Sequence, residues 1–117
     1  MIINKFETDG EVVILRLSGK LISSTLDGLK NAVDALFEEE KAKIIINFRL
    51  VNIIDSVAVG LLISRIKSAK KKEGTLLKFC EIQPAVTKLL MLADSDNWLE
   101  IYPTEDEALK SMTAKAS

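Results

Sequence analysis

The sequence predicts an α/β domain: a mixed β-sheet, with central strands parallel and the N-terminal hairpin antiparallel, packed with about four helices. Two observations lead to this fold class. From residue 12 onward, apolar runs of strand length alternate with stretches of helical periodicity, which is typical of right-handed crossovers between parallel strands. The run 43–48, Lys-Ile-Ile-Ile-Asn-Phe, is almost continuously apolar and β-branched, as expected of a strand covered on both faces.

The first two strands are expected at residues 2–7 and 12–17. Asp9-Gly10 between them favours the type I′ turn of an antiparallel hairpin. A capping box at Ser24 and Asp27 predicts the start of the first helix, because a hydroxyl and an acid three residues apart satisfy free backbone N–H groups. Apolar residues at helical spacing support this helix: Leu26, Leu29, Val33, Leu36 and Phe37.

Asp55 and Ser56 interrupt the apolar run that follows the third strand, and the spacing is helical from Val57 onward. Asp and Ser are both preferred N-cap residues. This second helix is expected to end at Gly74, a natural C-cap, after lysines that complement the negative end of the helix dipole. That role accounts without a ligand for the one marked basic cluster, Lys67, Lys70, Lys71 and Lys72.

The C-terminal part continues the same alternation. A strand is expected at 75–80, followed by a helix with Pro84 in its first turn. A short strand at 99–102 then leads to a last helix, which a second capping box of Thr104 and Glu107 opens.

Length and composition bound the class of protein. A chain of 117 residues suits one domain, which we expect over 1–112, with a frayed tail at 113–117. Sixteen basic and seventeen acidic side chains give a net charge of −1, which argues against a general nucleic-acid binder. No apolar run approaches the ~20 residues of a membrane span, and the N-terminus lacks the regions of a signal peptide. We therefore expect a cytoplasmic protein with no membrane partner.

Most catalytic constellations are excluded. The sequence has no histidine, hence no Ser-His-Asp arrangement, and its single Cys80 lies in a predicted strand, where an inert buried thiol is expected. No glycine-rich phosphate-binding motif is present. Asp55 follows a strand, as the phosphoacceptor of a response-regulator receiver does, but the acidic pair that would hold Mg²⁺ is missing. We expect no enzyme, no metal and no cofactor.

Ser56 has two compatible interpretations. As part of a helix N-terminus it is an ordinary cap, and composition alone favours that role. The same position suits regulation, because a phosphate on Ser56 would face free N–H groups at the positive helix end and leave the domain folded. It would add about −1.5 to −2 charges to an apolar-rimmed surface, and a partner packed there would meet desolvated charge.

The segment Asn47-Phe48-Arg49-Leu50-Val51-Asn52-Ile53-Ile54-Asp55-Ser56-Val57-Ala58-Val59-Gly60-Leu61-Leu62 resembles the signature of STAS domains, specifically of bacterial anti-sigma-factor antagonists. Further similar elements are Leu17-Ser18-Gly19-Lys20-Leu21 with Thr25, Gly74-Thr75-Leu76, Glu81-Ile82-Gln83-Pro84-Ala85-Val86, and Glu105-Asp106-Glu107-Ala108-Leu109. The resemblance spans essentially the whole chain, in order and at matching spacing, and implies a STAS fold.

The resemblance further implies a partner switch. An antagonist of this family binds an anti-sigma factor that is also a serine kinase, and thereby releases the sigma factor. The kinase phosphorylates the serine after the signature aspartate, here Ser56 after Asp55, which blocks binding, and a serine phosphatase restores it. The expected partner-binding residues are Gly19, Ile22, Ser23, Ser24, Asn52, Ile54, Asp55, Ser56, Val57, Ala58, Val59 and Gly60.

Two alternatives stay open. Val57 and Ala58 stand where the family usually has Ser or Thr followed by Gly, which favours a STAS module that does not switch, either a scaffold or a subunit of a larger sensory or transport assembly. A small-ligand or nucleotide sensor is the other alternative, although no phosphate-cradling loop supports it. A homodimer through an exposed hydrophobic helix face is also compatible with the sequence.

Overall fold

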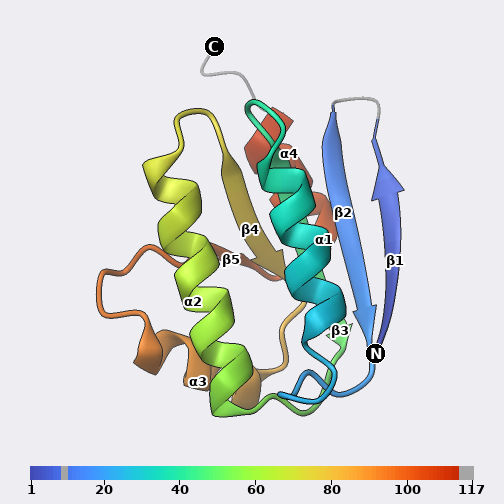
Figure 1. Cartoon of the computed structure of the whole chain (residues 1–117), viewed down its shortest axis with the longest axis vertical. Helices are drawn as coiled ribbons and strands as arrows, with labels where there is room; N and C mark the ends of the chain where they lie inside the picture. The colour runs from blue at the N-terminus through green and yellow to red at the C-terminus, as the bar shows by residue number, and fades with distance from the viewer. Residues whose placement is uncertain (9–10, 114–117) are drawn as a thin grey trace.

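The structure, a computed structural model, describes residues 1–8 and 11–113 (Figure 1). Strands and helices follow one another in the order that the sequence predicts. The elements are β1 Ile2–Glu7, β2 Val12–Ser18, α1 Asp27–Phe37, β3 Lys43–Leu50, α2 Ser56–Lys71, β4 Leu76–Cys80, α3 Pro84–Ala93, β5 Ile101–Tyr102 and α4 Glu105–Thr113.

The strands form one sheet in the order β1-β2-β3-β4-β5. β1 pairs with β2 in antiparallel fashion, with Ile2 opposite Ser18, and the other three pairings are parallel. The predicted mixed sheet with an antiparallel N-terminal hairpin is therefore confirmed. The predicted turn at Asp9-Gly10 lies outside the described residues.

Helices cover both faces of the sheet (Figure 1). One core lies between the sheet and α1, α2 and α3, and within it the rings of Phe48 and Phe79 pack with centroids 5.1 Å apart. A smaller core lies on the opposite face, where Ala108 and Met112 of α4 pack against β2, β3 and β4. β3 is buried by both layers, as its β-branched sequence predicts. Among the described helices, none is long and apolar enough for a membrane crossing.

The predicted capping box at Ser24 and Asp27 is wrong. α1 begins at Asp27, and its N-cap, Leu26, makes no side-chain cap bond. The nearby hydroxyl of Thr25 has a different role: it donates to the Lys20 carbonyl at 2.6 Å and accepts from the Ile22 N–H at 3.1 Å. These bonds close a turn in the loop before the helix, so the loop, and not the first helical turn, uses the local polar side chain.

Other element ends differ by a few residues. The C-cap of α2 is Lys72, and Gly74, with φ +80°, lies in the turn beyond it that leads to β4. β5 is shorter than the predicted strand at 99–102. The second capping box is confirmed, because the Glu107 N–H donates to the Thr104 hydroxyl at 3.1 Å. α4 extends to Thr113, and residues 114–117 of the predicted tail lie outside the described residues.

Candidate functional site

Two loops at the carboxyl ends of neighbouring strands lie side by side. The Gly19 N–H donates to the Leu50 carbonyl at 3.1 Å, and the Leu21 N–H donates to the Ile53 carbonyl at 2.9 Å. An isolated parallel bridge joins Leu21 to Ile54. The loop after β2 therefore continues the β2–β3 pairing and is held against the segment that enters α2.

Asp55 joins these two loops to the start of α2. It is the N-cap of the helix, and its Oδ1 accepts from the Ala58 N–H at 2.9 Å. Its Oδ2 accepts from the Ser23 N–H at 2.8 Å, and its own N–H donates to the Leu21 carbonyl at 3.3 Å. The N–H groups of Ala58 and Ser23 hold the pKa of this carboxyl below its ordinary value. The carboxylate is thus ionised at neutral pH and fixes the relative position of loop and helix.

Ser56 is the first residue of α2 and is exposed. Within the described part of the chain its hydroxyl has no hydrogen-bond partner. Two exposed apolar residues flank it in the sequence, since Val57 is 55% and Ile53 is 43% exposed. A phosphate on Ser56 would stand beside the Asp55 carboxylate, which already accepts from the Ala58 N–H. One of the N–H groups that a phosphate was expected to face is therefore already bonded to Asp55, and the added charge would be only partly compensated.

The structure brings the other predicted partner residues together at this end of the sheet, with one exception. Ala58 is 0% exposed and packs into the core beneath α2. It faces inward because it lies on the core side of the first helical turn, so its side chain cannot contact a partner. The exposed residues are Gly19, Ser23, Ser24, Asn52, Ser56, Val57 and Gly60, and the half-buried ones are Ile22, Ile54, Asp55 and Val59.

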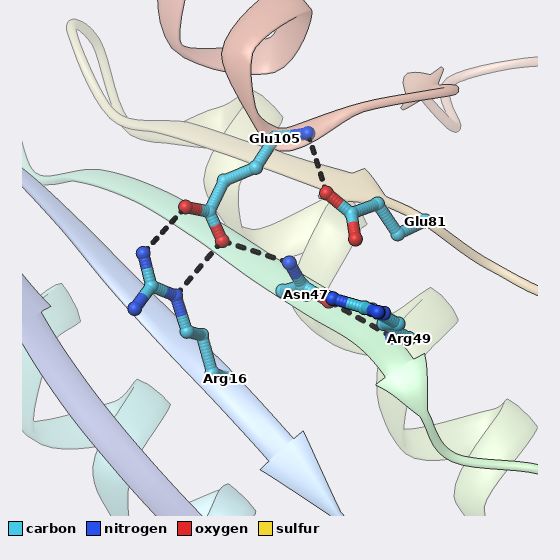
Figure 2. Close-up of polar contacts among 5 residues, drawn as sticks. All are labelled: Arg16, Asn47, Arg49, Glu81 and Glu105. Carbon is cyan, nitrogen blue, oxygen red and sulfur yellow. Dashed lines mark hydrogen bonds and ion pairs between the residues drawn. The ribbon is translucent and has the colours of Figure 1, made fainter.

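A polar cluster that the sequence did not indicate lies on the other face of the sheet (Figure 2). Glu105, the first residue of α4, accepts from the Arg16 guanidinium at 2.6 and 3.0 Å and from the Asn47 amide at 2.7 Å. Glu81 caps the helix, since its Oε2 accepts from the Glu105 N–H at 2.9 Å. Asn47 Oδ1 also accepts from the Arg49 N–H at 2.8 Å. We call these five residues the α4 anchor.

The α4 anchor explains how the last helix is held on the sheet. Arg16, and then Asn47, lower the pKa of Glu105, against the opposing effect of its partial burial. The buried Asn47 is satisfied at both ends of its amide. The partners of Glu105 are 89 and 58 positions away in sequence, and no local pattern relates them. Only the fold brings them together.

The same region contains a group with the composition of a cation site. Cys80, Glu81 and Glu105 have ligand atoms within 4.8 Å of one another. Their chemistry does not fit a metal well. Burial raises the pKa of the Cys80 thiol to about 12, which disfavours the thiolate that binds metals. Both Glu105 oxygens are already bonded to Arg16 and Asn47. The arrangement therefore serves packing and anchoring.

Comparison with known proteins extends over most of the chain. Residues 5–108 match the sequence model of the STAS domain. A relative from Paenibacillus polymyxa, named anti-sigma F factor antagonist, is 28% identical over 102 residues, which are 86% of this chain and 86% of that protein.

Solved structures share the fold. An anti-sigma factor antagonist from Mycobacterium paratuberculosis has a TM-score of 0.79 at 24% identity, covering 95% of this chain and 92% of that one. The Bacillus cell fate determinant SpoIIAA in its phosphorylated form has a TM-score of 0.70 at 23% identity, covering 94% and 98% of the two chains.

Proposed function

The chain belongs to the STAS domain family, and we propose that it is an anti-sigma-factor antagonist whose binding is switched by phosphorylation of Ser56. The observation that carries the proposal is the Ser56 hydroxyl, exposed at the start of α2 beside two loops that Asp55 holds together. The names of the Paenibacillus polymyxa relative and of the phosphorylated SpoIIAA structure support it.

In the unphosphorylated state, an anti-sigma factor packs on the surface formed by the loop after β2, the segment before α2 and the first turns of α2. Val57 and Ile53 supply exposed apolar area at this surface, and burial of such area drives association. The sigma factor is then released and free to act in transcription. A switch of this kind, which draws on ATP, belongs in the cytoplasm, where we place the protein.

Phosphorylation breaks the interaction through charge. The kinase activity of the anti-sigma factor transfers the γ-phosphoryl group of ATP to Ser56 Oγ, the hydroxyl proton is released, and ADP leaves. The new group adds about −1.5 to −2 charges beside the ionised Asp55 carboxylate, on a surface that the partner would have to desolvate. A serine phosphatase reverses the state, since water cleaves the ester to regenerate Ser56 and inorganic phosphate. The chain itself acts as a binding protein and not as an enzyme.

A STAS scaffold that does not switch is the second candidate. It is favoured by Val57, an exposed apolar residue directly after Ser56, where the family usually carries a hydroxyl. The neighbouring departure, Ala58, carries less weight because its side chain is buried and leaves the surface unchanged.

Affinity capture with variants distinguishes these candidates. Wild type, Ser56→Ala and Ser56→Asp are immobilised and exposed to lysate of the source cell, and bound proteins are identified by mass spectrometry. Ser68→Asp is the matched control, because Ser68 is exposed on the same helix but outside the proposed surface. We expect an anti-sigma factor with wild type, Ser56→Ala and Ser68→Asp, and its loss with Ser56→Asp. Recovery of the same partners by all four proteins would support the scaffold.

A further inference from the structure

The free edge of β1 is a surface that the proposed switch does not use. β1 is the first strand of the sheet and has β2 on one side only among the described strands. In an antiparallel pair, residues that exchange hydrogen bonds with the neighbour alternate with residues whose N–H and C=O groups point away. The Thr8 N–H donates to the Val12 carbonyl at 2.9 Å, in the register that places Phe6 opposite Ile14. The backbone groups of Ile3, Lys5 and Glu7 therefore point outward.

The side chains of this edge carry both apolar area and unpaired charge. Phe6 is 50% exposed on the face that α4 partly covers, and the Arg16 guanidinium lies 5.1 Å from its ring centroid. Lys5 and Glu7 lie on the opposite face of the strand and are exposed. Within the described residues, neither of them forms an ion pair. The unpaired N–H and C=O groups of a sheet edge are a template for pairing with another strand, and charged side chains on the edge oppose any partner that does not neutralise them.

A second copy of the chain complements this edge in one register. A closed symmetric dimer pairs the two β1 edges in antiparallel fashion about a two-fold axis. An axis at Lys5 would set the two lysines opposite each other, which is unfavourable. An axis at Asn4 would set Lys5 opposite Ile3 and leave both charges unpaired. An axis at Phe6 sets Lys5 of each copy opposite Glu7 of the other, so that the symmetry gives two ion pairs. It also brings the two Phe6 rings together at the narrow, non-hydrogen-bonded position.

We propose that two copies of this chain associate through the free edges of β1, with the two-fold axis at Phe6 and reciprocal Lys5–Glu7 ion pairs. The two sheets then form one continuous sheet, and the outward backbone groups of Lys5 and Glu7 exchange hydrogen bonds across the axis. Figure 1 shows β1 at the outer edge of the sheet, away from α2. The dimer therefore does not use α2, although Gly19 of the proposed partner surface lies beside Met1 at the end of β1, and the inference does not rest on the proposed function.

Charge reversal tests the ion pairs. The mass of the full chain is measured by sedimentation equilibrium over a range of concentrations, for wild type, Lys5→Glu, Glu7→Lys and the double exchange. We expect wild type to approach the mass of two chains. Each single variant should weaken association about tenfold or more, because both symmetric pairs become repulsive, and the double exchange should restore it. A wild type that stays monomeric at millimolar concentration overturns the proposal. A dimer that forms equally strongly in wild type and in both single variants overturns it as well.

Cysteine cross-linking tests the register. Phe6→Cys places its thiols at the axis, where the Cα atoms of a non-hydrogen-bonded pair lie about 4.5 Å apart, within disulfide reach. Asn4→Cys is the matched control on the same exposed strand, with Cα atoms about 13 Å apart in this register. The native Cys80 is buried and stays out of the reaction. We expect a rapid disulfide dimer for Phe6→Cys only. Equal cross-linking of both variants, or cross-linking of Asn4→Cys alone, contradicts the register.

Discussion

Replacement of Gly60 by alanine is expected to stabilise the protein. Gly60 lies in the interior of α2 and is exposed, and a Cβ atom added there meets nothing within 4 Å. Glycine in a helix interior is about 0.8–1.0 kcal/mol less favourable than alanine, because it loses more backbone freedom on folding. With no contact to offset this gain, Gly60→Ala should raise the free energy of unfolding by about 1 kcal/mol and the Tm by about 3–6 °C.

Urea unfolding followed by circular dichroism measures this change, with an expected rise of the midpoint by about 0.5–1 M. A urea midpoint that is unchanged or lower would refute the reasoning. It would mean that the space at Gly60 is not open, or that the backbone there is not regularly helical. Gly28→Ala in α1 is a control outside the proposed partner surface. Gly60→Gln tests binding as well as stability. It should remain folded yet bind the anti-sigma factor more weakly than Gly28→Ala does, because its longer side chain would stand on the proposed partner surface.

The other predictions concern the face of the sheet that α4 covers and the turn between α2 and β4. Because Arg16 lowers the pKa of Glu105, their ion pair stabilises the fold above the ordinary glutamate pKa of about 4.3, and this stability is lost as pH falls through the lowered pKa. Glu105→Gln should therefore lose less stability than wild type between about pH 5 and pH 2 in urea titrations, and identical profiles would contradict this. Cys80, buried and with its pKa raised to about 12, should resist iodoacetamide at neutral pH until the chain is unfolded; modification of the native protein at the rate of a free thiol would disprove this. Gly74→Ala should lower the Tm, with a cost of about 1–2 kcal/mol, because φ is +80° and the new Cβ would lie 2.7 Å from Lys41 Cγ; an unchanged melting curve would exclude that strain.

Local signals in the sequence were sufficient for most of the fold. The alternation of strand and helix patterns predicted the order of elements, and the continuous apolar run of β3 predicted a strand buried on both faces. Pro84 marked the first turn of α3. Asp55-Ser56 marked the start of α2, although the sequence left open which of the two is the cap. The structure assigns the cap to Asp55.

The sequence failed at one local turn and at the contacts between distant segments. The capping box expected at Ser24 and Asp27 does not form, because α1 begins at Asp27 with Leu26 as its N-cap, and the Thr25 hydroxyl bonds within the loop before it. Asp55 bonds across to Ser23, a contact between residues 32 positions apart. The α4 anchor joins residues of β2, β3 and α4. These bonds of Asp55 and of the α4 anchor depend on the fold of the sheet, because their partners lie 32 to 89 positions apart, and a single sequence has no periodicity that encodes them.

The most direct test of the partner switch is the affinity of the recovered anti-sigma factor for the chain in its two states. Isothermal titration calorimetry would compare the unmodified protein with protein stoichiometrically phosphorylated at Ser56, at equal ionic strength. We expect tight binding of the unmodified form and a loss of about 100-fold or more on phosphorylation, since an uncompensated charge would enter a desolvated interface. Equal affinity of the two forms would contradict the switch and leave Ser56 as an exposed residue at the start of a helix.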